Sequence, residues 1–254
     1  MAGEGGWLED ATLVAHCLLI ETDDGLVLVD TGYGTGDIAD PKRLGLPFSQ
    51  AIRPQLRAEE TALAQVEALG FSAADVRHIV PTHLDVDHAG GISDFPEAEV
   101  HIFADEHDAA TNPGLREKPR YLRAHFEHGP RWTRYEVEGD KWFGFDSVRV
   151  IGADSEVALI PLPGHSRGHC AVAVDSDGWM LHCGDAYFHR NEIADHPSCP
   201  PGLVVFETLV ALRNGERKRN RDRLAELARD HRDEIEIFCA HDEVELARMQ
   251  SRAG

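Results

Sequence analysis

The sequence predicts an α/β protein in which β-sheets pack face to face and helices cover their outer sides. Its strands fall into two batches along the chain, and each batch is accompanied by helical segments, as in layered folds of this class. The 254 residues, 42% of them hydrophobic, suffice for one large domain with a proper core. Because the sequence contains neither a linker nor a short-period repeat, we expect a single domain over residues 1–254.

The first batch of strands opens with a hairpin. Residues 12–31 are two apolar runs joined by an Asp-Asp-Gly turn at 23–25, where Asp-Gly supplies the positive φ that tight turns require. Residues 59–69 place apolar side chains at helical spacing and stop at Gly70, a residue suited to a helix C-terminus. Further strands are expected at 76–80 and 100–103.

Residues 111–135 interrupt this pattern because they are polar, basic and aromatic. We expect an inserted helix-and-loop excursion here, which forms the lid or wall that selects a substrate. The second batch of strands is expected at 148–151, 157–162, 170–174, 179–182 and 235–239, with helices at 203–230 and 244–249.

The charge balance excludes several classes of partner. Lys and Arg total 25 against 45 Asp and Glu, a net charge of −20, which repels nucleic acid and anionic membrane surfaces. Five widely spaced cysteines form neither a disulfide framework nor a cysteine-rich zinc site. The N-terminus lacks the features of a secretion signal, so we expect a cytoplasmic protein with a small-molecule substrate and leave its oligomeric state open.

The segment His83-Leu84-Asp85-Val86-Asp87-His88 is the most informative one for chemistry. Its two imidazoles and two carboxylates follow an apolar strand directly, where a rigid scaffold projects side chains into a loop-built cleft. This set suits zinc, iron or manganese. The alternative is a polar turn that happens to be rich in His and Asp.

Three more potential ligands follow apolar strands in the same way: His165, Asp185 and His241. Such repeated placement is what a single site at the edge of a sheet produces, and it disfavours a chance origin. For His169 we expect a hydrogen bond to a ligand rather than metal binding.

The order HLDVDH, PGHS, GDA and AHD, preceded by LVDTG around Asp30, resembles the metallo-β-lactamase superfamily of binuclear metallohydrolases over about residues 14–245. The resemblance implies an αββα four-layer sandwich with the metals at one edge. It implies that Asp185 bridges two metals and that Asp30 supports the site from behind. The other implied ligands are His83 and His165 on the first metal, and Asp87, His88 and His241 on the second.

Asp85 departs from the superfamily signature H-x-H-x-D-H, because it stands where the second histidine is usual. Three interpretations stay open. Asp85 is itself a ligand, which makes the first site harder and more suited to iron or manganese; or it falls short and only the second site fills; or the centre is degenerate. Zn²⁺ is the expected cofactor, as one or two ions, with Fe or Mn as alternatives.

The resemblance is nearest to N-acyl homoserine lactone lactonases, so we expect a metal-dependent hydrolase in which metal-bound hydroxide attacks the carbonyl of a lactone or carboxylic ester. Asp87 and Asp185 are expected to orient the hydroxide, and one of them to carry the proton to the leaving group. Tyr187 or His189 is expected to donate to the carbonyl oxygen. Those lactonases carry a tyrosine three residues after the bridging aspartate, where this chain has Phe188.

Three other functions stay open at this point. A phosphodiesterase or sulfatase uses the same metals but needs fixed positive charge beside them. A di-iron redox protein is suggested by the carboxylate at Asp85. A non-catalytic binding module is the function expected if the metal site is degenerate.

Overall fold

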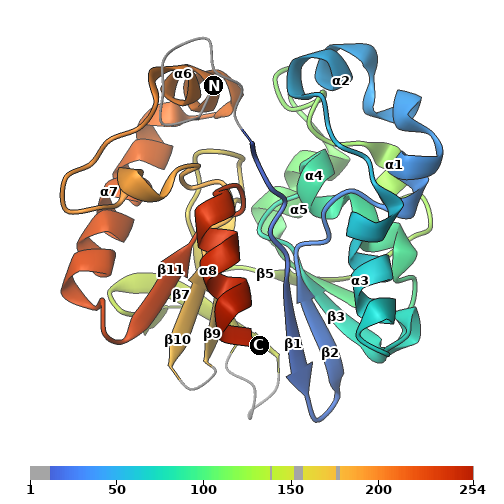
Figure 1. Ribbon diagram of the computed structural model, residues 1–254, viewed down its shortest axis with the longest axis horizontal. Helices are drawn as coiled ribbons and strands as arrows, with labels where there is room; N and C mark the ends of the chain where they lie inside the picture. The colour runs from blue at the N-terminus through green and yellow to red at the C-terminus, as the bar shows by residue number, and fades with distance from the viewer. Residues whose placement is uncertain (1–11, 138, 152–156, 176–177, 254) are drawn as a thin grey trace. The chain divides into compact units, whose positions relative to one another are not determined.

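The computed structural model describes residues 12–137, 139–151, 157–175 and 178–253. These residues form two compact units, each with its own sheet and core. Residues 17–135 make up the N-terminal unit, and residues 12–16 together with the described residues from 136 onward make up the C-terminal unit. Figure 1 labels the elements of both units. The prediction of a single domain stays a prediction.

The N-terminal unit contains a five-stranded sheet among its described residues, in the order β1-β2-β3-β4-β5. The predicted hairpin is confirmed, since β1 and β2 pair antiparallel around Gly25, whose φ is +119°. The remaining neighbours in this sheet pair in parallel. The strands are β1 (Leu18–Thr22), β2 (Gly25–Val29), β3 (Val76–Val80), β4 (Glu99–Phe103) and β5 (Arg131–Tyr135).

Helix α3 covers one face of this sheet (Figure 1). It spans Ala62–Ala68 and is shorter than the predicted 59–69, because residues 58–60 form a 3-10 turn. The Thr61 hydroxyl accepts the amide of Ala64 at 3.2 Å, and Gly70 follows the helix with a φ of +92°. Buried Val66 packs here against the apolar residues of β2, β3 and β4. The helices are α1 (Thr35–Ala39), α2 (Leu46–Ile52), α3 (Ala62–Ala68), α4 (Val86–Ala89) and α5 (Ala104–Thr111), with 3-10 turns at Pro41–Leu44, Ala58–Glu60, Ala73–Asp75, Gly90–Asp94 and Arg123–His125.

The end of the predicted excursion at 111–135 is a strand rather than loop or helix. Strand β5 pairs in parallel with β4 from Glu99↔Arg131 to Phe103↔Tyr135 and forms an edge of the sheet. Trp132 packs against the core of the unit. Arg131 and Arg134 on either side of it are typical of a solvent-exposed segment, which is why the sequence did not predict a strand here. A role as a substrate-selecting lid stays a prediction.

The C-terminal unit contains a six-stranded sheet among its described residues, in the order β11-β10-β9-β8-β7-β6. Only the pair β10 and β11 is parallel in this sheet; its other described neighbours are antiparallel. The strands are β6 (Asp140–Trp142), β7 (Phe145–Ile151), β8 (Val157–Pro161), β9 (Cys170–Asp175), β10 (Trp179–His182) and β11 (Ile235–Phe238).

The helical stretch predicted at 203–230 is two helices, because the chain breaks between them. The amides of Leu212 and Arg213 donate to the carbonyls of His165 and Gly164 at 2.9 and 2.8 Å instead of continuing a helix. Leu224 of the second helix is fully buried against the sheet, worth roughly 2 kcal/mol of transfer free energy. The helices are α6 (Pro201–Val210), α7 (Asn214–Asp230) and α8 (Glu243–Ala253), with a 3-10 turn at Arg190–Glu192.

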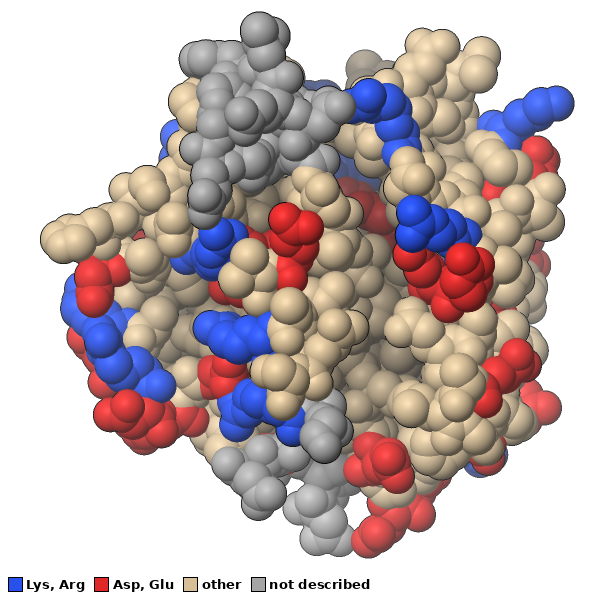
Figure 2. Space-filling model, viewed as in Figure 1, with Lys and Arg blue, Asp and Glu red and all other residues tan. Residues whose placement is uncertain are grey.

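Basic side chains on the face shown in Figure 2 lie beside acidic ones along α7 and do not form a continuous basic surface. Arg221 and Arg229 of α7, and Arg213 just before it, each pair with an acid on this helix. None of the helices in the described residues combines the length and apolar character needed to cross a bilayer.

Candidate metal centre

The predicted ligand motif of the N-terminal unit occupies the loop after β3 and the start of α4. Asp85 is the residue before the first helical position, and its carbonyl accepts the amide of His88 at 3.0 Å. This short turn brings Asp87 and His88 back toward His83, whose ring centroid lies 4.0 Å from that of His88. The structure therefore gathers the four motif residues in one place.

Asp30 holds the two imidazoles of this motif, that of His88 directly and that of His83 through Thr82, as the family resemblance implies. Its carboxylate accepts the backbone N–H of Thr82 at 2.7 Å and the Nδ1–H of His88 at 2.8 Å. The Thr82 hydroxyl donates to the same carboxylate at 2.9 Å and accepts the Nδ1–H of His83 at 3.0 Å. With the proton on Nδ1 in both rings, Nε2 carries the lone pair that binds a metal.

Gly90 and Gly91 allow the loop after β2 to lie against the end of α4. A Cβ on Gly90 would come within 2.8 Å of the Gly32 carbonyl, and one on Gly91 would come within 2.8 Å of the Thr31 carbonyl. Thr31 in turn donates its amide to the carbonyl of His88 at 2.8 Å. Side chains at these two glycines would push Asp30 away from His88.

Asp85 forms an ion pair that the sequence analysis did not identify. Its carboxylate accepts Nε–H and Nη2–H of Arg120 at 2.9 and 2.5 Å, while Asp85 Oδ2 lies 3.4 Å from Nε2 of His83. Burial opposes the charge on Arg120, but Asp85, together with Tyr121 and Glu106, more than offsets it, so the pKa of Arg120 is raised. Arg120 therefore neutralises the carboxylate that replaces the usual histidine.

Glu106 is a functional candidate that sequence reasoning missed. It is fully buried in α5 and accepts the amide of Leu84 at 3.0 Å and the hydroxyl of Tyr121 at 3.2 Å. This carboxylate holds the backbone between His83 and Asp85. A buried charge of this kind gives no local signal in the sequence.

In the C-terminal unit, Asp185 lies between two imidazoles. Its Oδ2 is 3.2 Å from Nε2 of His165, and its Oδ1 is 3.0 Å from Nε2 of His241. The Nδ1–H of His241 donates to the carbonyl of Val14 at 2.6 Å, so Nε2 again carries the lone pair. One carboxylate oxygen thus faces each ring, as a bridging ligand requires.

His169 supports Asp185 and is not placed as a ligand. Its Nδ1–H donates to the Leu162 carbonyl at 3.0 Å, and its Nε2 accepts the amide of Asp185 at 2.9 Å. Both ring nitrogens are therefore engaged, in agreement with the prediction of a hydrogen-bonding role. Gly164, with a φ of +141°, lets the His165 turn approach the backbone of Arg217, since a Cβ there would lie 2.3 Å from that amide nitrogen.

The predicted role of Tyr187 or His189 as a donor to a substrate stays a prediction. The Tyr187 hydroxyl is buried and donates to Glu245 at 3.2 Å, and His189 Nδ1 accepts the amide of Asn191 at 3.3 Å. Burial raises the pKa of Glu245 to about 7, and this carboxyl also accepts the amide of Cys239 at 2.8 Å. This arrangement favours a structural role for Tyr187.

Phe188 is the apolar neighbour of the C-terminal ligands. Its ring stacks on that of His241 at a centroid distance of 4.7 Å, and it also contacts His165 and Phe206. Glu192 accepts the amides of Phe188 and His189 at 3.0 and 3.1 Å, which fixes the loop after Asp185.

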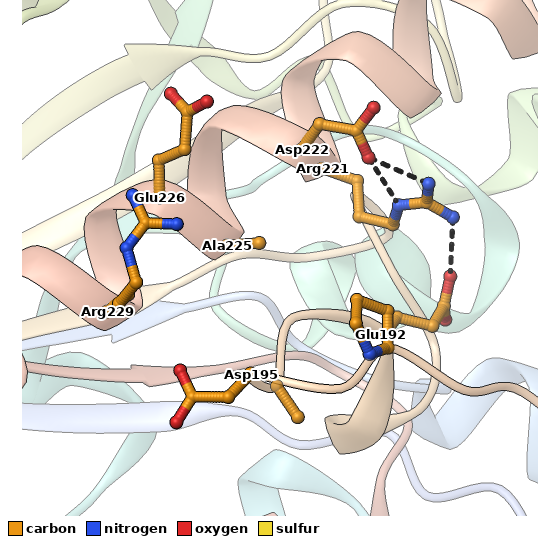
Figure 3. A pocket seen from close by; sticks show the side chains of 9 residues that line it. Glu192, Asp195, Arg221, Asp222, Ala225, Glu226 and Arg229 are labelled. Atoms are coloured by element: carbon orange, nitrogen blue, oxygen red, sulfur yellow. Dashed lines mark hydrogen bonds and ion pairs between the residues drawn. The ribbon is translucent and has the colours of Figure 1, made fainter.

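A pocket of about 260 Å³ beside α7 is lined by charged side chains (Figure 3). Arg221 there pairs with both Glu192 and Asp222, so these charges compensate one another. The lining contains none of the predicted ligands, and the pocket takes no part in the candidate centre.

The donor set fits a metal of the zinc type. Two donors on one zinc ion, with bonds of about 2.0–2.2 Å at tetrahedral angles, lie roughly 3.3 Å apart. The His83–Asp85, His165–Asp185 and His241–Asp185 separations of 3.4, 3.2 and 3.0 Å match this value. His88 Nε2 and Asp87 Oδ1 are more widely spaced at 4.0 Å.

The family model of the metallo-beta-lactamase superfamily matches residues 11–239. A probable metallo-hydrolase of Mycobacterium tuberculosis is 46% identical over 233 residues, which is 91% of this chain and 75% of that protein. An N-acyl homoserine lactonase of Azorhizobium caulinodans is 30% identical over 182 residues, which is 69% of this chain and 67% of that protein.

Solved structures resemble this chain in fold. A quorum-quenching N-acyl homoserine lactone lactonase superposes with a TM-score of 0.68 at 22% identity, covering 92% of this chain and 81% of its own. A Bacillus thuringiensis protein with N-decanoyl-L-homoserine at its active site gives 0.68 at 20% identity, covering 95% and 84%. The predicted fold class is therefore confirmed.

Proposed function

The chain belongs to the metallo-beta-lactamase superfamily and is a metal-dependent hydrolase of that superfamily, and we propose that its substrate is a lactone or a carboxylic ester. The observation that carries the metal centre on which this proposal depends is the orientation of the imidazoles. His83, His88 and His241 each donate Nδ1–H to an oxygen of their own unit and so present Nε2 as the metal-binding atom.

The proposed centre takes one or two Zn²⁺ ions, with Fe or Mn as alternatives. When bound, such ions lower the pKa of a water molecule toward neutrality and polarise a carbonyl oxygen. The ligands we propose are His83, Asp85 and His165 for one ion, Asp87, His88 and His241 for the other, and Asp185 for both.

The two catalytic carboxylates have different surroundings, which suggests different roles. Asp185 has a side chain only 4% exposed and a backbone amide held by His169, so it suits the fixed task of orienting the attacking water. The Asp87 side chain is 24% exposed and can reach a substrate, so we assign it the transfer of the proton to the leaving oxygen.

A neutral carbonyl substrate suits the surroundings better than a phosphodiester. Phosphoryl transfer needs fixed positive charge, but Arg120, the arginine bonded to Asp85, is already neutralised by that carboxylate. Phe188 adds an apolar surface against His241. The relatives named as N-acyl homoserine lactonases support a lactone in particular.

The proposal is tested on protein purified without added metal and without chelator. We expect at least one equivalent of zinc, iron or manganese by mass spectrometry, and hydrolysis of acyl lactones or p-nitrophenyl esters in preference to bis(p-nitrophenyl) phosphate. Asp185→Asn should lose bound metal and reduce turnover on the order of 10³-fold, the scale seen when a main electrostatic group is removed. Asp175→Asn, an exposed change at the end of β9, is the matched control.

Two results would contradict the proposal. Protein that takes up no metal even when metal is added would exclude the hydrolytic centre. A preference for the phosphodiester would keep the centre but exclude the carbonyl substrate.

A further inference from the structure

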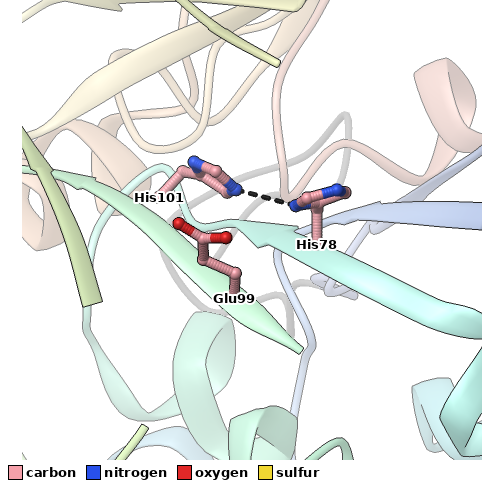
Figure 4. A group of neighbouring side chains, drawn as sticks. All are labelled: His78, Glu99 and His101. Carbon is pink, nitrogen blue, oxygen red and sulfur yellow. Dashed lines mark hydrogen bonds between the residues drawn. The ribbon is translucent and has the colours of Figure 1, made fainter. Parts of the chain in front are cut away.

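A cluster of two histidines and one glutamate lies on β3 and β4, on residues other than the proposed catalytic ligands (Figure 4). Glu99 and His101 are two positions apart on β4 and therefore point to the same face of the sheet. His78 is the direct cross-strand partner of Glu99 on β3. One donor atom from each of the three lies within 4.8 Å of the others.

The contacts of the cluster already resemble those of a metal site. His78 Nδ1 lies 2.9 Å from His101 Nε2, so two ring nitrogens face each other. His101 Nδ1 is 2.8 Å from the hydroxyl of Tyr135, and Glu99 accepts the hydroxyl of Thr133. Tyr135 and Thr133 thus hold His101 and Glu99 from the side, as outer partners of metal ligands do.

The protonation states also suit a metal. Burial lowers the pKa of His101 to about 4, and burial lowers the pKa of His78 as well. The Thr133 hydrogen bond lowers the pKa of Glu99, so the cluster holds two neutral imidazoles and one carboxylate at neutral pH. His101 is 3% exposed, whereas the other two are half-buried and allow an ion to enter.

We propose that His78, Glu99 and His101 bind a divalent transition-metal ion of the Zn²⁺ class through two nitrogens and one oxygen. The proton of His101 then sits on Nδ1 and is donated to the Tyr135 oxygen, while that of His78 sits on Nε2, so neither imidazole has to lose a proton. The two facing nitrogens separate from 2.9 Å to the roughly 3.3 Å that tetrahedral zinc requires. A water completes the coordination.

An ion bound at this site would link β3 to β4. These strands share few register pairs, His78↔Glu99 and Ile79↔Val100, and β3 leads directly to His83. An ion held by both strands fixes the strand that precedes the proposed catalytic ligands, and the thermal midpoint rises with the logarithm of the Zn²⁺ concentration once that exceeds the dissociation constant.

The test separates this site from the proposed catalytic centre. In the full-length background variant with His83→Gln, His88→Gln and His241→Gln, equilibrium dialysis against Zn²⁺ should still show one bound equivalent. Adding His78→Gln or Glu99→Gln should remove it, whereas adding His128→Gln, an exposed histidine of the same unit, should not. Tyr135→Phe should weaken Zn²⁺ binding about 10- to 100-fold.

The proposal is overturned if the background variant binds no Zn²⁺, or if its bound equivalent survives both His78→Gln and Glu99→Gln. Circular dichroism establishes that each variant is folded. If the background variant does not fold, the same comparison is made in the wild-type chain, where His78→Gln should lower the zinc content by one equivalent and His128→Gln should leave it unchanged.

Discussion

The two units hold their ligand residues with different kinds of groups. In the N-terminal unit, the side chains of Asp30 and Thr82 fix the rings of His83 and His88. In the C-terminal unit, His241 bonds the backbone carbonyl of Val14, and Asp185 is held through its own amide. Charged side chains must be compensated when buried, whereas backbone groups carry no net charge, so the two halves should respond differently to mutation and pH.

The residues around the proposed ligands also differ in charge between the two units. Asp85 in the N-terminal unit depends on a full ion pair with Arg120. In the C-terminal unit, the buried Glu245 binds neutral donors, Tyr187 and the Cys239 amide, and burial raises its pKa to about 7. The stability of the N-terminal unit should therefore depend on the Asp85–Arg120 ion pair. The stability of the C-terminal unit should depend on the protonation state of Glu245.

Arg120→Gln should have the largest effect on stability. The side chains of Arg120 and Asp85 are only 11% and 16% exposed, so the variant leaves a carboxylate without its counter-ion. We expect the metal-free protein to lose about 3 kcal/mol of unfolding free energy in urea. Bound Zn²⁺ should restore part of this loss. Arg123→Gln, an exposed change in the same segment, should cost about 0.5 kcal/mol or less, and equal losses for both variants would argue against the ion pair.

Glu245 should make stability fall as pH rises. Its pKa is raised from 4.5 to about 7 in the folded protein, so between these values the folded state keeps a proton that the unfolded state has released. Unfolding free energy should therefore drop by up to about 3 kcal/mol as pH increases through this window. Urea titrations of the metal-free protein across this range should show the slope reduced in Glu245→Gln and retained in Glu243→Gln, its exposed neighbour; a slope unchanged in both would refute the assignment.

Asp30→Asn and His169→Leu each remove a group that holds a proposed ligand, His88 in the N-terminal unit and Asp185 in the C-terminal unit. The first places an amide group where Thr82 and His88 both donate, and the second removes the acceptor for the Asp185 amide. Each should weaken Zn²⁺ binding about 10- to 100-fold in a competition assay with a chromophoric chelator. Asp24→Asn in the hairpin turn is the control. If only one of the two variants loses affinity, that unit alone determines metal binding.

Tyr187→Phe should have the smallest effect. Loss of the hydrogen bond to Glu245 should cost about 1 kcal/mol of stability. Turnover should change less than about threefold, since removing a group that takes part in proton transfer costs about 100-fold or more. A loss of turnover on that scale in a folded variant with normal metal content would restore the predicted role of Tyr187 as a donor to the substrate.

Much of the fold was predictable from local patterns. The 23–25 turn of the hairpin, the strands at 76–80 and 179–182, and the helix ending at Gly70 all agree with the structure. The break between α6 and α7 was not predictable, because Leu212 and Arg213 bond to a turn almost fifty residues away in the sequence. Strand β5 was also missed, because its pairing with β4 outweighs the polar character of its arginines.

The sequence by itself predicted which residues carry the ligand atoms, because each follows an apolar strand and belongs to a short motif. The family resemblance implied the support from Asp30, and the net charge of −20 disfavours anionic partners. Only the tertiary structure decided that Asp85 is paired with Arg120, 35 residues away, and that Glu106 holds Leu84. Buried ion pairs and hydrogen bonds of this kind join distant segments, and their stabilisation arises only after folding has removed both partners from water.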